Sequence, residues 1–572
     1  MAFIRLVLIN LFLAFPLTGI QTDEKFFIPP VNIPLLLSAN FGELRPDHFH
    51  SGIDIKTQGV TGKDVIAAAD GYVYRIGVSP SGFGKALYMR HPNGYSTVYG
   101  HLDRFNDEIE QYVKSRQYSQ KSFTVSLFPQ KDEFSYKQGD LIAYSGNSGS
   151  SGGPHVHYEI RKADSEEPVN PLLFSFGVKD DIRPVLEKLF IYPLSSSTSI
   201  NGKNAIKQLD LVAGGRGNYS ISAGNSIVIS GKAGFGIKSY DLLNNSHNKC
   251  AVYSIELVID STTVYKYTMD GFSFDESKYV NSHMDYATYI RSRIQVQKAY
   301  ILPNDRLRTY TATGRGVFNF SDGRTHKVDF HVADVHGNRS TLSFNVRSEP
   351  GGAVTAAADD TPGITVMPYS RQNTFAAKNV KVTIPANALY DTLRFQYRRI
   401  AGDGEMLSDI HQIATKYDPL HRAYTLSIKP DVIIPGKESK MLILKIDDNR
   451  KSPLNSTWEN GYLTARPATF GSFAAGIDTI PPSISPVGFA SENNLTGKRE
   501  LRIRIKDDLS GIKSYEPEID GAWALFEYDQ KNDLIIYRFD ADRITKGIRH
   551  NFSLKVSDRQ NNTSVYKATF VW

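Results

Sequence analysis

From about residue 180 onward, hydrophobic and polar positions alternate over short segments. A period of two predicts β-strands that turn one face towards a core. Turn signals such as Asp-Gly, Asn-Gly and Asn-Asn separate these segments. The clearest of them are "SIVISGKA", "VYSIELVID", "HKVDFHVAD", "VKVTIPA", "KMLILKI", "LRIRIKD" and "NFSLKVSD". Regular short strands of this kind predict about three antiparallel, immunoglobulin-like β-sandwich units.

An internal repeat divides this half of the chain. "GRTHKVDFHVADVHGNRSTLSFNV" (323–346) aligns with "GIRHNFSLKVSDRQNNTSVYKATF" (547–570) at Gly, His, Val-x-Asp and Asn, and "GIKSY" also occurs twice. The repeat predicts one sandwich at 180–348 and a second copy of it at 477–572. A third sandwich is expected at 362–475, after a stretch of small residues and before a Pro-rich join.

Residues 25–176 form a different, Gly-rich region that contains six of the 14 histidines. Its short alternating segments, such as "GYVYRIG" and "YSTVYGHL", again predict strands between Gly and Pro turns. Ile109, Tyr112 and Val113 are the exception, because their helical spacing predicts a short helix within 104–122. The whole chain is therefore expected to be mainly β, with a small β domain at its start.

The N-terminal residues 1–20 have the pattern of a signal peptide. Arg5 precedes a short apolar run, and Pro16 and small residues follow it. The run is well short of the roughly 20 residues that a membrane span needs, and no cysteine follows it for lipid attachment. The sequence therefore predicts an exported protein of the periplasm, cell envelope or medium that is not integral to the membrane.

Composition and charge exclude some functions. The net charge is only +6 over 572 residues, and no block of like charges occurs, so nucleic-acid binding is not expected. Cys250 is the only cysteine, which excludes an intramolecular disulfide.

The histidines of the first region supply candidate chemistry. His50 and Asp54 flank Gly52 in "HSGIDI", and on a strand this even spacing would place both side chains on one face. His155 and His157 alternate in the same way in "PHVHYEI". Either pair alone is more often a polar pair on an ordinary strand. Together, His50, Asp54 and His157 would supply the three protein ligands that are typical of catalytic zinc, with one position left for water.

Several sequence blocks of this region resemble the lysostaphin or LytM-type zinc metallopeptidases, which are peptidoglycan endopeptidases. The resemblance covers about residues 35–175. The blocks are "HSGIDI", "ADGYV", "YGHL", "KQGDLIAYSGNSGSSGGPHVHYEI" and "VNPLLF", in the order of the family.

The resemblance implies a role for each of five residues. His50, Asp54 and His157 would bind one Zn²⁺ per chain, and His101 and His155 would be catalytic. One of the two catalytic histidines would deprotonate or orient water, and the other would stabilise the oxyanion and pass a proton to the leaving amine. The family leads from its His-Leu pair to its Gly-Asp turn in a few residues, whereas this chain has an insertion at about 104–135.

The resemblance also implies a function. We expect a zinc metalloendopeptidase that hydrolyses stem peptides or cross-bridges of peptidoglycan, for cell-wall remodelling or lysis. The alternative is a non-catalytic envelope scaffold or regulator that activates other cell-wall hydrolases. The β-sandwich units are expected to present the peptidase and could dock components of the envelope, although fold alone does not assign them a function.

Overall fold

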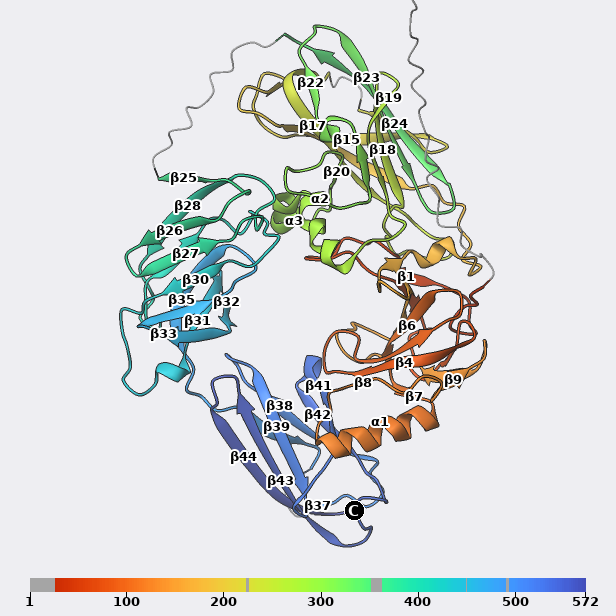
Figure 1. Cartoon of the computed structure of the whole chain (residues 1–572), viewed down its shortest axis with the longest axis vertical. Coiled ribbons are helices and arrows are strands. Elements are labelled where there is room, and N and C mark those ends of the chain that lie inside the picture. Colours follow the sequence, from red (N-terminus) through yellow and green to blue (C-terminus); the bar gives the residue numbers. More distant parts are fainter. Residues whose placement is uncertain (1–25, 223–225, 351–362, 449, 490–492) are drawn as a thin grey trace, which may run out of the picture.

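The computed structural model describes residues 26–222, 226–350, 363–448, 450–489 and 493–572. The predicted signal peptide, residues 1–20, lies outside the described residues. The described chain consists mainly of β-strands, as predicted, and Figure 1 shows them gathered into successive β units.

The first unit is built on a nine-stranded sheet and a three-stranded sheet. The nine-stranded sheet has the order β1-β2-β11-β6-β5-β4-β8, with β12 paired to β11 and β9 paired to β4, and its neighbours are antiparallel. The elements of the unit are β1 (Leu37–Ala39), β2 (Ile53–Lys56), β3 (Asp64–Ile66), β4 (Gly71–Val78), β5 (Lys85–Arg90), β6 (Tyr95–Leu102), β7 (Arg104–Phe105), α1 (Asp107–Gln120), β8 (Val125–Leu127), β9 (Ser135–Tyr136), β10 (Leu141–Tyr144), β11 (His155–Lys162), β12 (Pro168–Val169) and the 3₁₀ turn η1 (Pro171–Leu173).

Helix α1 confirms the helix that was predicted within 104–122. The side chain of Asn106 caps the first turn by accepting a hydrogen bond from the backbone amide of Ile109. Ile109 and Val113 turn inwards and are buried in the core of the unit. The predicted insertion therefore contains one helix that packs on the sheet, followed by β8, which adds a strand beside β4.

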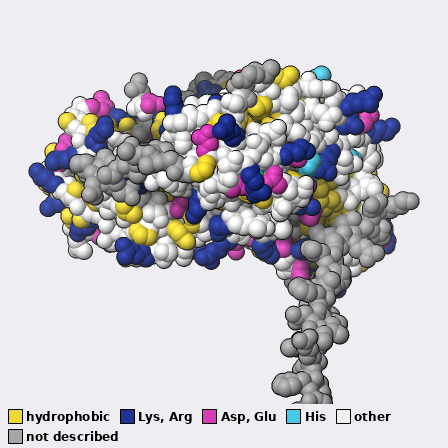
Figure 2. Space-filling model, turned by 90° about the horizontal axis from the view of Figure 1, so that it is seen from above, with side chains coloured by type: hydrophobic (Ala, Val, Ile, Leu, Met, Phe, Trp, Pro, Cys, Tyr) yellow, Lys and Arg dark blue, Asp and Glu magenta, His cyan; other side chains and the backbone are white. Residues whose placement is uncertain are grey.

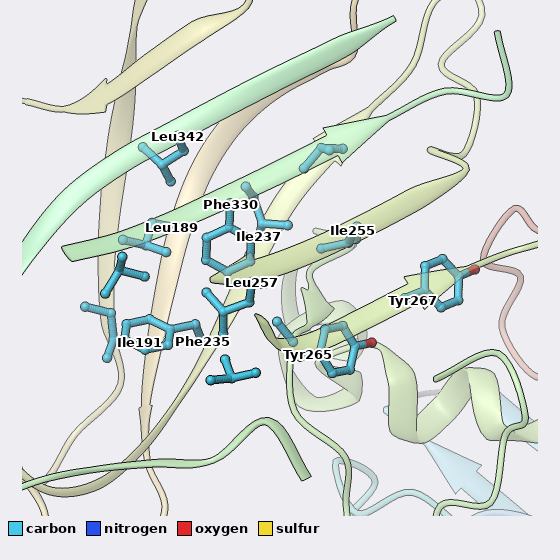
Figure 3. Packing of buried hydrophobic residues seen from close by; sticks show 14 of the residues in the cluster. Leu189, Ile191, Phe235, Ile237, Ile255, Leu257, Tyr265, Tyr267, Phe330 and Leu342 are labelled. Carbon is cyan, nitrogen blue, oxygen red and sulfur yellow. The ribbon is translucent and has the colours of Figure 1, made fainter. Parts of the chain in front are cut away.

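The second unit contains a twelve-stranded sheet with a large core. Figure 3 shows part of this core, in which Phe235 and Ile237 of β17 meet Leu257 of β18 and Phe330 of β23. The alternation predicted from the sequence is visible in β23, where buried and exposed residues take turns. The elements are β13 (Val185–Pro193), β14 (Ser199–Ile200), β15 (Lys207–Gly215), β16 (Asn218–Ile221), β17 (Val228–Tyr240), β18 (Ser254–Ile259), β19 (Thr262–Thr268), η2 (Phe274–Tyr279), α2 (Val280–His283), α3 (Tyr286–Ser292), β20 (Gln297–Lys298), β21 (Tyr310–Ala312), η3 (Gly314–Gly316), β22 (Phe318–Phe320), β23 (Thr325–Ala333) and β24 (Arg339–Ser348).

The third unit packs a six-stranded sheet against a five-stranded sheet, with a core between them. Its elements are β25 (Ile364–Met367), β26 (Asn373–Ala377), β27 (Val380–Ile384), β28 (Leu393–Ile400), β29 (Ile410–Ile413), β30 (Thr425–Ile428), η4 (Glu438–Lys440), β31 (Met441–Asp447), β32 (Arg450–Leu454), β33 (Ser456–Glu459), β34 (Tyr462–Ala465) and β35 (Gly471–Ile477).

The fourth unit, the C-terminal sandwich, has sheets of four and five strands. Its elements are β36 (Ser483–Val487), β37 (Asn493–Asn494), β38 (Glu500–Lys506), β39 (Ile512–Ile519), β40 (Ala522–Trp523), β41 (Phe526–Asp529), η5 (Gln530–Asn532), β42 (Leu534–Arg538), β43 (Arg549–Asp558) and β44 (Thr563–Val571).

The longer of the two sequence matches has a structural counterpart. β23 and β24 form the same antiparallel hairpin as β43 and β44. His326 and His550, at matching positions, each place Nδ1 2.6 Å from a carboxylate oxygen, of Asp260 and Asp520 respectively. The "GIKSY" match has no such counterpart. Its first copy forms the end of β17, and its second copy leads into β39. β39 pairs with β43 in the same way that β18 pairs with β23, so the equivalent of β39 in the second unit is β18 and not β17.

The four units follow one another in a ring, so that the C-terminal sandwich lies beside α1 of the first unit (Figure 1). Lys114 on α1 forms an ion pair of 2.5 Å with Asp540, and the ring of Tyr118 meets that of Trp523 edge to face. On the face seen in Figure 2, Lys and Arg side chains are spread over the surface with Asp and Glu among them. This distribution agrees with the low net charge and offers no basic stripe.

Candidate metal centre and its surroundings

Three neighbouring strands bring four of the five predicted residues together. β11 lies between β2 and β6 in the sheet. The antiparallel register sets His157 opposite Asp54 of β2 and opposite Gly100 of β6, and His101 follows Gly100. Side chains at paired positions of adjacent strands lie about 5 Å apart at Cβ, so this register converges the candidate ligands.

His50 reaches the same point from a different local structure than the sequence predicted. The expectation was one strand face that carries residues 50, 52 and 54, but β2 begins at Ile53 and His50 lies in the preceding loop. Its backbone is held there by two hydrogen bonds, from its amide to the carbonyl of Glu43 and from the amide of Gly42 to its carbonyl, each of 2.9 Å. The imidazole still points at Asp54.

The donor atoms of His50, Asp54 and His157 lie within bonding reach of one ion. His50 Nε2 is 3.2 Å from His157 Nδ1 and 3.2 Å from Asp54 Oδ1, and His157 Nδ1 is 2.8 Å from the same carboxylate oxygen. Ligands at roughly 2.0–2.1 Å in a tetrahedral zinc site are separated by about 3.3 Å. Two imidazoles and one carboxylate with these separations fit a divalent zinc ion.

Each histidine of the cluster uses its second ring nitrogen to fix its orientation. His50 Nδ1 donates to the carbonyl oxygen of Asn40 (2.7 Å), and His157 Nε2 lies 2.8 Å from Glu159 Oε1. His101 Nδ1 donates to the carbonyl of Ser148 (2.9 Å), and His155 Nδ1 donates to that of Gly153 (2.8 Å). These partners leave one nitrogen of each ring free to face the cluster, as is usual for metal-ligating histidine.

Glu159 lies behind His157 and is hydrogen-bonded to its ring. Its side chain is fully buried and also accepts from the hydroxyl of Ser51 and from Arg161 Nε, at 2.5 and 2.6 Å. Burial opposes its charge, but the charge of Arg161 and the bond to His157 outweigh burial and lower the pKa of Glu159 to about 2. A permanent carboxylate therefore stands behind the candidate ligand.

The pKa values of Asp54 and His157 are set by the same competition between burial and neighbouring charged or hydrogen-bonding groups. Burial by itself would raise the pKa of Asp54, but His50, His155 and His157 together hold it well below its ordinary value. Burial opposes the charged form of His157, yet hydrogen bonds to Asp54 and Glu159 raise its pKa to about 9. Without a cation, His157 is thus a protonated ring between two carboxylates, and a metal would displace that proton.

His101 and His155 stand side by side at the open edge of the cluster. Their ring centroids are 4.7 Å apart, and His155 Nε2 is 3.5 Å from Asp54 Oδ1. Burial, followed by the charges of His157 and His155, lowers the pKa of His101 to about 3. His101 is therefore neutral at pH 7, and the nitrogen that Ser148 leaves free carries a lone pair that can accept a hydrogen bond.

Close packing around His157 requires a residue without a side chain at position 52. A Cβ on Gly52 would lie 2.3 Å from the carbonyl oxygen of Tyr158 and 3.0 Å from Cε1 of His157. On another side of the ring, Phe83 stacks on His157 with centroids 4.9 Å apart. The sequence pattern identified Gly52 only as the residue between His50 and Asp54, and Phe83 carried no signal.

Several partners of the site were not predictable from residue spacing. Asn40, Ser148 and Gly153 act through their backbone carbonyls, and such atoms leave no residue-type signature. His48 is exposed beside Asp47, and His91 is a buried histidine bonded to Thr97.

The loop before His155 is held by the far end of the chain. Lys531, in η5 of the C-terminal sandwich, donates to the carbonyl oxygens of Asn147 and Ser151. The same loop supplies the carbonyls of Ser148 and Gly153 that orient His101 and His155. The C-terminal sandwich is thus in direct contact with the segment that positions both histidines.

Residues 48–118 match peptidase family M23. The chain carries an M23-like domain. The match contains His50, Asp54 and His101, and the resemblance to lysostaphin and LytM-type metallopeptidases that the sequence blocks indicated is confirmed. Residues 364–478 match a second family, the Zu5-like domain, over the third unit.

Relatives of the M23-like domain include named peptidases. An uncharacterized metalloprotease of Haemophilus influenzae is 37% identical over 131 residues, which are 23% of this chain and 21% of that protein. The DD-carboxypeptidase/endopeptidase Mpg of Neisseria meningitidis is 32% identical over 158 residues, 27% of this chain and 30% of that protein. The chain thus spans under a third of the length of these relatives.

A solved M23 protein is similar to part of the chain. It is the catalytic domain of the prophage-encoded M23 protein EnpA from Enterococcus faecalis, with 27% identity, a TM-score of 0.19, and coverage of 25% of this chain and 95% of that one. Within the described residues, no helix is both long and apolar enough to cross a membrane.

Proposed function

We propose that the chain is a zinc-dependent metalloendopeptidase that hydrolyses peptide bonds in peptidoglycan stem peptides or cross-bridges, for cell-wall remodelling or lysis. One observation carries the proposal: three donor atoms of His50, Asp54 and His157 meet within 3.2 Å of one another beside the paired rings of His101 and His155. A cluster that only stabilised a strand pair would not need two further histidines with oriented, free nitrogens.

One Zn²⁺ held by His50, Asp54 and His157 would supply Lewis acidity, which activates water at neutral pH and polarises a carbonyl group. Asp54 contributes a charge that stays ionised, because its pKa is held low. Glu159 fixes the ring of His157 and keeps Nδ1 turned towards Asp54. The buried position of His50 and His157 keeps competing water from these donors.

His101 and His155 are the proposed proton-handling pair. Each donates Nδ1 to a backbone carbonyl, so that Nε2 is the atom available to the substrate. One of them accepts the proton of the attacking water, and the other stabilises the oxyanion of the tetrahedral intermediate and passes a proton to the leaving amine. The low pKa of His101 keeps its ring neutral at pH 7, so its free nitrogen can accept a hydrogen bond from the attacking water.

The substrate class is inferred from the relatives and from the predicted export. Mpg of Neisseria meningitidis is named a DD-carboxypeptidase/endopeptidase, and a further relative, 26% identical over 139 residues, is the cell division protein DipM of Caulobacter vibrioides. An exported peptidase of this kind would meet peptidoglycan in the periplasm, in the envelope or outside the cell, and the β units could dock envelope components.

A digestion experiment tests the proposal. Full-length protein, loaded with Zn²⁺, is incubated with purified peptidoglycan, and new amino termini are identified by mass spectrometry. We expect cleavage by the wild type, no cleavage and no bound zinc for His50→Ala, and bound zinc without cleavage for His155→Ala. Zinc-loaded wild type that leaves peptidoglycan intact would refute the enzymatic proposal.

The alternative is a non-catalytic scaffold or regulator that activates other cell-wall hydrolases. The contact of Lys531 with the loop before His155 supports this alternative, because a second unit is hydrogen-bonded to the loop that orients His101 and His155. The two proposals differ in one measurement: a regulator would raise the activity of an added hydrolase, and His155→Ala would regulate as well as the wild type.

A further inference from the structure

Three aspartates border strands of the second unit, one before β13, one after β17 and one after β23. They are Asp180, Asp241 and Asp334, called here the first acidic cluster. Ligand atoms of Asp180, Asp334 and the neighbouring His336 lie within 4.8 Å of one another. Asp241 follows the last residue of β17, and burial, followed by the charges of Asp180 and Asp334, raises the pKa of its carboxyl group.

The cluster is buried and two of its oxygens have no partner. The side chain of Asp180 is 0% exposed, and Asp241 and Asp334 are 2% and 3% exposed. Among the described residues, neither Asp180 Oδ2 nor Asp241 Oδ1 has a hydrogen-bond partner. A buried carboxylate oxygen without a hydrogen-bond partner costs free energy, and a positively charged ligand would offset that cost.

The C-terminal sandwich contains the same three aspartates and serves as an internal comparison. Asp478, Asp507 and Asp558, the second acidic cluster, occupy the positions before β36, after β38 and at the end of β43. Their ligand atoms also lie within 4.8 Å of one another. In both units an asparagine four residues after the third aspartate donates its side-chain amide to that carboxylate and to the carbonyl of the first aspartate.

The two clusters differ in how their oxygens are satisfied. In the second cluster, the backbone amide of Ser510 donates to Asp478 Oδ2 (3.1 Å), and the amide of Gly511 donates to Asp507 Oδ1 (2.6 Å). The first cluster lacks these amides among the described residues, since its unpartnered oxygens belong to the equivalent residues Asp180 and Asp241. Backbone amides also donate in the first cluster, from Ile182 to Asp180 Oδ1 (3.0 Å) and from Asn338 to Asp334 Oδ1 (2.9 Å), but none donates to Asp180 Oδ2 or Asp241 Oδ1 among the described residues.

We propose that the first acidic cluster binds one Ca²⁺ ion, with Asp180, Asp241 and Asp334 as ligands. Three carboxylates are hard oxygen donors of the kind that Ca²⁺ prefers. His336 stands at the rim, with Nδ1 3.7 Å from Asp180 Oδ2 and 28% of its side chain exposed. The corresponding residue of the second cluster is Gln560, so the histidine is not part of the shared arrangement.

The electrostatics agree with this assignment. Burial, and then the charges of Asp180 and Asp334, raise the pKa of Asp241 to about 8. Burial also raises the pKa of Asp180 to about 7, with the charge of Asp334 adding to the effect. A bound divalent cation would remove this repulsion between the carboxylates.

The position of the cluster indicates what the ion would stabilise. Asp241 exchanges two backbone hydrogen bonds of 2.9 Å with Cys250, and Ala251 next to it exchanges two with the side chain of Asn40. The backbone carbonyl of Asn40 is the acceptor for His50. The ion would therefore brace the junction between the second unit and the M23-like domain.

Calcium binding to the full chain tests the proposal. The protein is freed of metal with a chelator, dialysed at about pH 8, and titrated calorimetrically with CaCl₂ into the range of about 1 mM that suits extracellular calcium sites. The wild type should bind Ca²⁺, and Asp241→Asn should lose one equivalent. Asp507→Asn, the matched change in the second cluster, should keep it.

Thermal unfolding gives a second readout that does not depend on binding heat. In chelator, Asp241→Asn should unfold at the same or a higher temperature than the wild type, because it removes a repelling charge. In the presence of Ca²⁺, the wild type should unfold at a higher temperature than Asp241→Asn, because only the wild type binds the ion. The proposal is overturned if the wild type binds no Ca²⁺ and gains no stability from it. It is also overturned if Asp507→Asn, instead of Asp241→Asn, abolishes Ca²⁺ binding. A third contradicting outcome is that only Zn²⁺ binds and that His336→Gln abolishes this binding.

Discussion

Lys531 donates a hydrogen bond of 2.9 Å to the carbonyl oxygen of Ser151, across 380 residues of chain. The contact joins the C-terminal sandwich to the loop whose carbonyls orient His101 and His155. It links the end of the ring to the proposed proton-handling pair.

Lys531→Ala should therefore impair hydrolysis without removing metal. The loop loses a donor shared by two carbonyls, and small displacements of reacting groups are costly, so we expect kcat to fall by about 10-fold with little change in KM. Zinc content and muropeptide cleavage rates check this. Lys555→Ala, on the same sandwich but paired with Glu516, is the control. An increase in kcat would instead identify the C-terminal sandwich as a brake.

The helix of the insertion should anchor the same sandwich. Tyr118 on α1 meets Trp523 at 5.4 Å between ring centroids, and Arg543 lies over Tyr118 at 4.0 Å. Tyr118→Ala removes both contacts, so hydrogen exchange should accelerate in α1 and in the strand of Trp523. Arg116→Ala, which changes a residue stacked on Tyr112 of the same helix, should leave exchange at Trp523 unaltered. Equal protection in Tyr118→Ala would mean that the helix does not hold the sandwich.

Glu159→Gln should weaken zinc binding rather than abolish it. The variant keeps the shape of the side chain but removes the charge that holds His157, and partners behind a metal ligand typically contribute roughly 10–100-fold in affinity. Competition with a chromogenic chelator measures the zinc dissociation constant. Glu166→Gln, which also faces Arg161 but not His157, is the matched control. An unchanged affinity would show that Glu159 only supports the fold.

A methyl group at position 52 should disturb both the fold and the metal centre. Its Cβ would overlap the carbonyl oxygen of Tyr158, so Gly52→Ala should lower the free energy of unfolding by about 1–3 kcal/mol. Zinc binding should weaken in parallel, because the same Cβ presses on His157. Urea denaturation and zinc titration check the two effects. Gly152→Ala, whose Cβ would meet nothing within 4 Å, should behave as the wild type.

Much of the candidate site was accessible from sequence because it depends on residue type. Imidazole and carboxylate groups at even spacing identified Asp54 and His157, and the strand register then set them opposite each other. Backbone acceptors such as Asn40 were not accessible, since any residue type offers a carbonyl.

Contacts between units could not be predicted from the sequence either. Lys531 resembles any surface lysine until the ring closes and brings it to Ser151. The "GIKSY" pair shows the opposite error, because five identical residues occupy strands that are not equivalent in the two sandwiches. A short identity carries little information about strand position when alternating patterns recur throughout the chain.

The second unit should lose stability in acid through His283. This ring is 1% exposed, stacks on Tyr267 at 4.5 Å and is hydrogen-bonded between Tyr310 and Gln297. Burial, and then the charge of Lys298, lowers its pKa to about 3, whereas an unfolded histidine titrates near 6.5. Between about pH 6.5 and 3, His283 therefore binds a proton in the unfolded state but not in the folded state. The free energy of unfolding falls by up to about 1.4 kcal/mol per pH unit as the pH drops through this range.

His283→Gln should flatten this acid dependence. Urea midpoints of the wild type and the variant, measured at several pH values between about 6.5 and 4, should converge as pH falls, because only the wild type loses the contribution of the neutral ring. His48→Gln, a change at an exposed histidine beside Asp47, should leave the wild-type slope in place. Parallel curves for the wild type and His283→Gln would mean that protonation of another buried group governs acid unfolding.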